Sequence, residues 1–276
     1  MRRRLTARRQ FSLVTVLSLL STPVWAQWAD VPQAAIPRKA DGQPNLSAPT
    51  PRRSDGKPDL TGIWRSTDNT FLRDIARDLS PDAVPYQSWA KALFDARKDG
   101  SHSREDPDAH CLPQGVPKID AVAYPWKIIE TPNSYVIIYE TFTYWRQIFT
   151  DGRRVDPDAN PTWMGYSTGA WDGDTFVVDT RGFNGKAWLD QLGRPTTDRL
   201  HVIERFRRPD LGRLTIDITI DDPGAYTRPW TVKQEVYLRP GWEPLEFICG
   251  ENNRDIERLP GGHLVVPNIE AAGLQR

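Results

Sequence analysis

From Ala123 to Cys249 the sequence alternates apolar stretches with short turns, and no helical pattern interrupts them. Four hairpins are expected, with turn residues such as Trp171-Asp172-Gly173 and Pro240-Gly241 between paired strands. The expected strands cover residues 126–130, 135–150, 162–170, 174–180, 200–207, 213–220, 230–238 and 245–249. Sequential antiparallel strands have edges that must be covered, and closing the sheet covers them. We therefore expect a mainly β fold, an antiparallel up-and-down (lipocalin-like) barrel, with a twisted two-sheet sandwich as the alternative.

The first 26 residues have the features of a secretory signal peptide. A basic start precedes the short apolar stretch FSLVTVLSLL, and Val24-Trp25-Ala26 places small residues where a signal peptidase reads. The pair Arg8-Arg9 also resembles a twin-arginine signal. The apolar stretch is too short to cross a bilayer, as is every later one. We therefore expect a periplasmic or secreted protein.

Between the signal peptide and the barrel we expect an arm and a helical segment. Residues 27–58 are rich in proline and should form an extended arm, in which DGQPNLS at 41–47 is echoed by DGKPDLT at 55–61. Ser80-Pro81-Asp82 is a typical helix start and predicts a helix over about residues 80–97. This helix belongs to a single barrel domain expected over residues 59–276.

The net charge limits the classes of binding partner, and the cysteine content indicates the cellular compartment. Without residues 1–26 the chain has 31 basic and 36 acidic side chains, a net charge of −5. Such a chain does not attract nucleic acid or an anionic membrane, so the expected partner is a small molecule. The two cysteines, Cys111 and Cys249, favour a disulfide in an oxidising compartment over two buried thiols or a reactive pair. The oligomeric state is left open.

Several familiar catalytic motifs are absent. The sequence has no nucleotide-binding loop, no His-Glu-x-x-His and no Cys-x-x-Cys. Its four histidines, at positions 102, 110, 201 and 263, lack metal-ligand spacing in any single stretch. We therefore expect neither a metal nor an organic cofactor, which leaves acid–base chemistry carried out by side chains.

His201 and Glu204 are the first candidates for that chemistry. His201 opens the strand HVIERFRR, and histidine titrates near neutral pH, where it can transfer protons. Glu204 lies on the opposite face of the same expected strand. A hydrogen-bonded histidine at the barrel rim is the alternative for His201.

Glu140 and Arg146 are the second pair of candidates. If residues 135–150 form one strand, both share a face with Val136, Ile138 and Phe142. A charge among apolar neighbours is costly unless it is paired or hydrated, so an interior cavity would accommodate both. We expect Arg146 to hold an anion or to stabilise an enolate. A buried salt bridge between Glu140 and an arginine is the alternative.

The run from Asn160 to Asp190 combines six aromatic side chains with four aspartates. Aromatic rings suit stacking on a sugar or an aromatic ring, while carboxylates and amides hold hydroxyl groups. Part of this run is a long loop that we expect over one barrel mouth. The expected ligand-binding residues, which include two from the CGENN stretch, are Tyr144, Tyr166, Trp188, Asp190, Glu251 and Asn252. Core packing of the tryptophans and turn formation by the asparagines are the alternatives.

A set of motifs resembles a family of exported bacterial proteins of unassigned activity. These motifs, spread over residues 55–255, are DGKPDLTGIW, CLPQGVPK, YWRQIFTDGR, NPTWMGYS, WDGDTFVVDTRGF, HVIERFRR and CGENN. The resemblance implies export and a shared β-rich domain. Separately, Gly62-Ile63-Trp64 is similar to the Gly-x-Trp that begins lipocalin barrels.

Two functions fit these features. The first is an exported enzyme that performs cofactor-independent acid–base chemistry (elimination, isomerisation or hydrolysis) on a hydroxylated or aromatic small molecule in the barrel. It would be a lyase, an isomerase or a hydrolase. The second is a lipocalin-like protein that binds a small hydrophobic or aromatic ligand without catalysis. An enzyme needs at least one group whose pKa matches its working pH, and a carrier does not.

Overall fold

The computed structural model describes residues 36–251 together with residues 253 and 258. The expected signal peptide, the first part of the arm and Asn252 lie outside the described residues. Among the described residues, no helix is both long and apolar enough to span a membrane.

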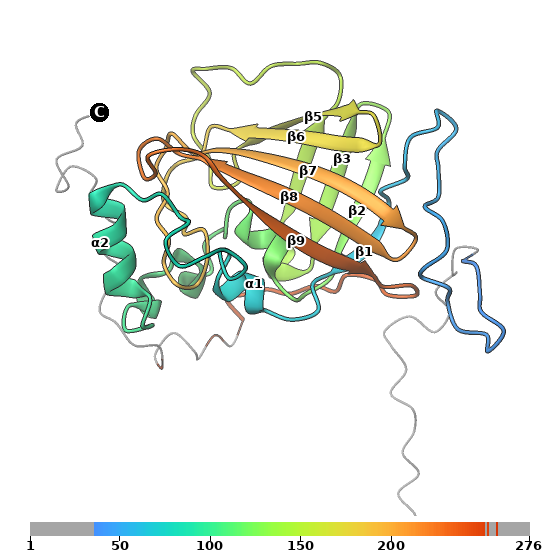
Figure 1. The fold of residues 1–276 in the computed structure, drawn as a ribbon, viewed down its shortest axis with the longest axis horizontal. Coiled ribbons are helices and arrows are strands. Elements are labelled where there is room, and N and C mark those ends of the chain that lie inside the picture. Colours follow the sequence, from blue (N-terminus) through green and yellow to red (C-terminus); the bar gives the residue numbers. More distant parts are fainter. Residues whose placement is uncertain (1–35, 252, 254–257, 259–276) are drawn as a thin grey trace, which may run out of the picture. The chain divides into compact units, whose positions relative to one another are not determined.

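Nine strands form a closed barrel in sequential order (Figure 1). Neighbouring strands are antiparallel, except that β4 and β5 run parallel. The strands are β1 (Gly62–Arg65), β2 (Trp126–Thr131), β3 (Ser134–Tyr139), β4 (Trp145–Phe149), β5 (Tyr166–Asp172), β6 (Thr175–Arg181), β7 (His201–Asp210), β8 (Arg213–Asp221) and β9 (Trp230–Leu238). The expected up-and-down barrel is confirmed, and the two-sheet sandwich is wrong.

The Gly-x-Trp sequence forms β1, the strand that closes the barrel. Trp64 pairs with Trp126 on one side and with Leu238 on the other. Gly62 has φ 137°, and a Cβ there would lie 2.8 Å from Leu238 Cδ1, so closure at this point requires glycine. The guanidinium of Arg208 lies 4.8 Å from the centroid of the buried Trp64 ring and fixes this end of the barrel.

Residues 135–150 form two strands rather than the one long strand expected. The 3₁₀ turn η4 (Thr141–Thr143) separates β3 from β4 and contains two residues with φ 57°, Phe142 and Thr143. The turn changes the phase of the alternation. In β3, Tyr135, Ile137 and Tyr139 are buried, whereas Ile138 is exposed.

The connection between β1 and β2 contains the helices. They are α1 (Thr70–Arg73), α2 (Ser88–Arg97) and three 3₁₀ turns, η1 (Ser103–Glu105), η2 (Pro107–His110) and η3 (Lys118–Ala121). The expected helix over 80–97 begins only at Ser88. Tyr86 instead forms a β-bridge with Tyr226, and Gln87 N donates to Ala225 O. In Figure 1, α2 lies at the barrel end opposite the β7–β8 hairpin.

The echo in the arm is a structural repeat of one tight turn. Gly42 and Gly56 have φ 80° and 81°, and each carbonyl accepts a hydrogen bond from the arginine four residues earlier. The second copy is fixed to the β5–β6 turn, because Arg52 forms two hydrogen bonds with Asp174. The arm is therefore folded from residue 36 onward and not simply extended.

The segment after β9 crosses the outside of the barrel. The expected strand 245–249 is wrong, since this segment has no strand. Leu245 N instead donates to Glu140 Oε2 at 2.9 Å. The predicted disulfide between Cys111 and Cys249 is confirmed and ties the segment to the turn after η2.

Candidate active site in the barrel interior

Four polar side chains meet inside the barrel near the end covered by the β1–β2 connection. Tyr139, Arg146 and Glu204 come from inward positions of β3, β4 and β7, and Asp120 comes from η3. Each is at most 3% exposed. The remaining interior is largely apolar, so these groups interact mainly with one another.

Arg146 is the centre of this cluster. Its Nη1 donates to Glu204 Oε1 at 3.2 Å, and its Nη2 donates to Glu204 Oε2. Nε donates to Ser167 Oγ at 3.0 Å, and Nη2 also donates to Thr180 Oγ1 at 2.9 Å. Burial lowers the pKa of Arg146, but Glu204, Tyr139 and Asp120 together raise it by more, and the net pKa lies above its usual value. Arg146 is therefore a fixed cation in the barrel core.

Asp120 is the carboxyl group of the cluster whose two oxygens have different partners. Its Oδ1 accepts a hydrogen bond of 2.6 Å from the Tyr139 hydroxyl, whereas its buried Oδ2 has no hydrogen-bond partner in the described structure. Burial and then the nearby Glu204 raise the pKa of Asp120 to about 7, although the Arg146 guanidinium, 3.6 Å away, lowers it. Burial and the Asp120 charge hold the pKa of Tyr139 well above its usual value, so this hydroxyl stays a donor.

The turn that carries Asp120 is anchored on two sides. On the barrel side, Gln234 Nε2 donates to the Asp120 carbonyl at 2.7 Å. On the other side, Lys118 Nζ lies 2.5 Å from Asp106 Oδ2 and 3.4 Å from Asp108 Oδ2, with only 1% of its side chain exposed. These contacts hold η3 over the cluster.

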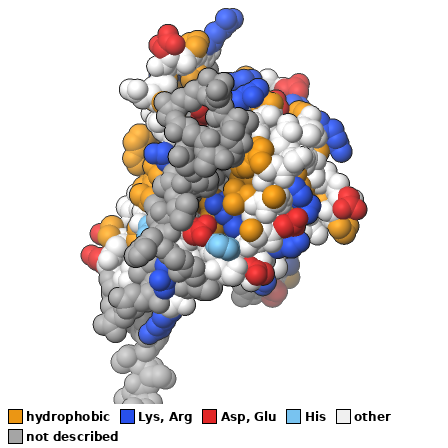
Figure 2. Space-filling model, turned by 90° about the vertical axis from the view of Figure 1, so that its left-hand side faces the viewer, with side chains coloured by type: hydrophobic (Ala, Val, Ile, Leu, Met, Phe, Trp, Pro, Cys, Tyr) orange, Lys and Arg blue, Asp and Glu red, His pale blue; other side chains and the backbone are white. Residues whose placement is uncertain are grey.

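In Figure 2, which views the molecule from the α2 side, acidic, basic and apolar side chains are interspersed on the visible surface.

The structure brings together two of the four expected catalytic residues. Arg146 and Glu204 face the interior and form an ion pair. Glu140 does not join them, because it lies in the turn after β3 and binds the chain outside the barrel through Leu245 N. The expectation that Glu140 faces the interior, with Val136, Ile138 and Phe142, is therefore wrong, and its cause is the change of phase at η4.

His201 lies on the outer wall and away from the cluster. Its Nε2 is 2.8 Å from Asp179 Oδ2 on β6, and its Nδ1 is 3.8 Å from Asp221 Oδ2 on β8. Strand alternation explains this position, because His201 and Glu204 are three residues apart and point to opposite sides of β7. The arrangement matches a hydrogen-bonded rim histidine.

Trp188 and Asp190 are buried in the loop between β6 and β7. The Arg97 guanidinium lies 4.2 Å from the Trp188 ring centroid. Asp190 forms an ion pair with Arg194 and accepts a hydrogen bond of 3.1 Å from Ile75 N. Both side chains are at most 4% exposed and fasten the loop to the helical region. Trp188 and Asp190 therefore offer no surface to a ligand.

The other expected ligand-binding residues are dispersed. The Tyr144 hydroxyl donates to Cys111 O at 3.4 Å, and the Tyr166 hydroxyl donates to Asn160 O at 2.7 Å. Glu251 is exposed at the end of the described chain, and Asn252 lies outside the described residues. None of the three described residues contacts the interior cluster through a side-chain hydrogen bond.

Two residues of the cluster, and Ser167 beside it, lay outside the expected site. Tyr139 was detectable, because it alternates with Tyr135 and Ile137. Asp120 gave no signal, because the stretch around it has no period. Ser167 is the centre of the sequence GYSTG, which fits the Gly-x-Ser-x-Gly pattern. That serine lies within β5 and hydrogen-bonds to Arg146 and Thr180, so the strand–turn–helix setting of a nucleophilic serine is missing.

Comparisons of the chain with protein-family models, with curated proteins and with solved structures found no match. In the part of the chain that the structure describes, no three His, Cys, Asp or Glu side chains come together as a metal site.

Proposed function

We propose that this chain is an exported enzyme that carries out acid–base chemistry on a hydroxylated or aromatic small molecule inside the barrel. The observation that carries the proposal is the buried Asp120 carboxyl group, whose Oδ2 has no hydrogen-bond partner in the described structure and whose pKa is raised to about 7. A general acid or base works best when its pKa lies near the operating pH. Export is supported by the signal-like sequence of residues 1–26 and by the disulfide.

In this proposal Asp120 removes a proton from the substrate and returns it at a second position or to a leaving group. Tyr139 holds Oδ1 and leaves Oδ2 for the transferred proton. The fixed charge of Arg146 stabilises the negative charge that develops on an enolate or alkoxide. Glu204 keeps Arg146 in place through two hydrogen bonds. This division of roles favours elimination or isomerisation among the three reaction types considered.

Access to the cluster requires movement of η3. The four polar groups are at most 3% exposed, and the Asp120 carbonyl is bonded to Gln234. Opening of this turn would admit a substrate, and its closing would return Asp120 to Tyr139 and Arg146 and enclose the substrate in an apolar, water-poor space. Such enclosure strengthens the electrostatic interactions of Arg146 with the reacting group.

A binding protein without turnover is the second candidate. The nearly complete burial of the cluster is also compatible with a binding protein, because buried polar groups can hold a ligand without reacting with that ligand. Proton exchange separates the two functions, since only an enzyme needs Asp120 to change its protonation state during each cycle.

Asp120→Asn tests the proposal. The amide keeps the size of the carboxyl group and can accept from Tyr139, but it cannot exchange a proton. Purified protein is screened for turnover and binding of glycosides and plant aromatics. Turnover should fall by about 10²–10⁴-fold, the usual contribution of a catalytic proton transfer. Asp222→Asn is the matched control, because Asp222 is also buried but hydrogen-bonds to Thr197 and Gly224 in the loops. Equal turnover in wild type and Asp120→Asn would contradict the proposal.

A further inference from the structure

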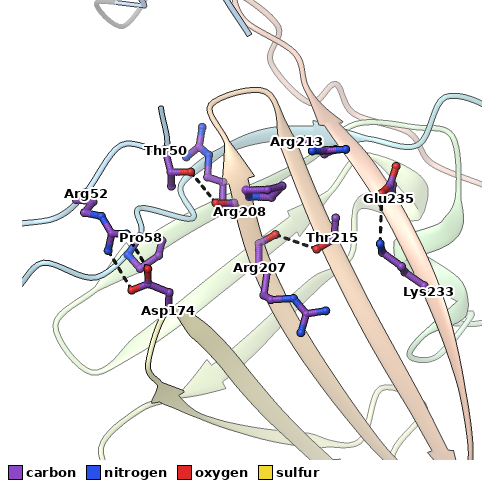
Figure 3. Close-up of a pocket in the computed structure, with 11 residues that line it drawn as sticks. Thr50, Arg52, Pro58, Asp174, Arg207, Arg208, Arg213, Thr215, Lys233 and Glu235 are labelled. Atoms are coloured by element: carbon purple, nitrogen blue, oxygen red, sulfur yellow. Dashed lines mark hydrogen bonds and ion pairs between the residues drawn. The ribbon is translucent and has the colours of Figure 1, made fainter. Parts of the chain in front are cut away.

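A groove lies on the outer wall at the barrel end away from the interior cluster. Its volume is about 430 Å³, and it is bounded by the second turn of the arm and by β7, β8 and β9 (Figure 3). Alternation along the strands produces its floor, because Arg207, Thr215 and Glu235 are in register on three neighbouring strands and point outward. The arm supplies the facing wall through Thr50, Arg52 and Pro58.

The side chains that line this groove are predominantly cationic. Five of them are basic and two are acidic. The basic residues come from the arm and from all three strands, and they are Arg52, Arg207, Arg208, Arg213 and Lys233. The Arg208 guanidinium is turned away to Leu211 O and the Trp64 ring, and Arg52 is hydrogen-bonded to Asp174. The cations that remain for a ligand are therefore Arg207, Arg213 and Lys233. The acidic residues of the groove are Asp174 and Glu235. This local excess of positive charge contrasts with the net charge of −5 of the chain without residues 1–26.

Three cations of the groove form ion pairs and yet remain exposed to solvent. Arg207 pairs with Asp217, Arg213 lies 3.4 Å from Asp210, and Lys233 lies 3.7 Å from Glu235. The basic side chains in these pairs are 42–57% exposed. Exposed pairs contribute little and exchange partners readily. Arg213 Nε is moreover buried without a hydrogen-bond acceptor in the described structure.

We propose that this groove binds a small anion that carries two or more phosphate or carboxylate groups. Arg207 and Arg213 present planar donors suited to oxyanions, and Lys233 adds a third cation. Strands lie about 4.8 Å apart, so the backbones of β7 and β9, which carry Arg207 and Lys233, are separated by roughly 10 Å. One monovalent group cannot engage both sides, whereas an anion with separated charges can. The site is independent of the proposed acid–base function.

The test is calorimetric titration of the purified full chain with inorganic pyrophosphate and, separately, with tricarballylate. These two probes distinguish phosphate from carboxylate recognition. At least one should bind at low salt, and its affinity should fall as ionic strength rises. Arg207→Gln should weaken that binding by at least tenfold. Glu235→Gln removes an acidic group from the groove and should strengthen it.

Arg205→Gln is the matched control for Arg207→Gln. Arg205 is also on the outer face of β7, is 39% exposed and pairs with one aspartate, Asp172, but it does not line the groove. The Arg205→Gln variant should bind the probe with the same affinity as the wild type. Equal weakening by Arg205→Gln and Arg207→Gln would overturn the proposal, as would the absence of binding by both probes at millimolar concentration. If Arg207→Gln does not fold, Arg213→Gln takes its place with the same expected loss.

Discussion

The Tyr139 hydroxyl donates a hydrogen bond of 2.6 Å to Asp120 Oδ1, while Asp120 Oδ2, buried beside the Arg146–Glu204 ion pair, accepts none from the described residues. The two oxygens of one carboxyl group therefore have different environments. Oδ1 is held by a donor whose own pKa is too high for it to lose its proton near neutral pH. Oδ2 is the site where a proton relieves the cost of a buried negative charge.

The raised pKa of Asp120 predicts that the free energy of unfolding falls as pH rises. Burial raises the pKa of Asp120 from 3.8 to about 7, so between these values the folded protein binds a proton that the unfolded chain has lost. The stabilising effect of that proton is complete below pH 3.8 and disappears as pH approaches 7. A shift of this size corresponds to roughly 4 kcal/mol. Asp120→Asn should lack this part of the pH dependence.

Denaturant unfolding of wild type and Asp120→Asn between pH 4 and pH 8 measures how much Asp120 contributes to the pH dependence of stability. The difference in unfolding free energy between the two proteins should move in favour of the variant as pH increases. A constant difference between wild type and Asp120→Asn across this range would show that Asp120 does not titrate as described.

Removal of Arg146 should destabilise the barrel more than removal of the whole ion pair. Arg146→Met leaves the Glu204 carboxylate buried without its cation, which typically costs about 3–5 kcal/mol. Arg146→Met combined with Glu204→Leu replaces the pair by apolar side chains and should recover most of that loss. Unfolding free energies of the two single variants and the double variant give the coupling directly. Additive losses would mean that the pair is not a stabilising unit.

The barrel was predictable from the sequence because alternation and turn residues act locally. β8 shows this clearly, since Ile216, Ile218 and Ile220 are all buried as the pattern requires. β1 was not among the strands expected from alternation, because it has four residues and pairs with strands far along the chain; only the Gly-x-Trp resemblance pointed to it. The site was predicted only in part. Arg146 and Glu204 follow strand alternation, whereas Asp120 reaches the interior through a 3₁₀ turn whose position depends on tertiary contacts.

His201→Ala should affect stability slightly and leave turnover and ligand binding intact. His201 bonds Asp179 on the outer wall and does not contact the interior cluster. A lost hydrogen bond of this kind costs about 1 kcal/mol. Thermal melting and a ligand titration on the same variant measure the two effects. A loss of turnover without a loss of stability would return His201 to the list of catalytic residues.

Reduction of the disulfide should release the segment after β9 and destabilise the whole domain. Cys111 and Cys249 are 138 residues apart in the sequence. In the chain-entropy account, a cross-link over such a distance stabilises by about 4–5 kcal/mol, because it restricts the unfolded chain. The Cys111→Ala/Cys249→Ala variant should unfold at a correspondingly lower denaturant concentration and should exchange amide hydrogens faster at Leu245 and Phe247, which bond the β3–β4 turn. Mass analysis of the wild type after alkylation without reductant should find no modified thiol. Two alkylated cysteines in folded wild type would contradict the bridge, and unchanged stability of the variant would contradict its stabilising role.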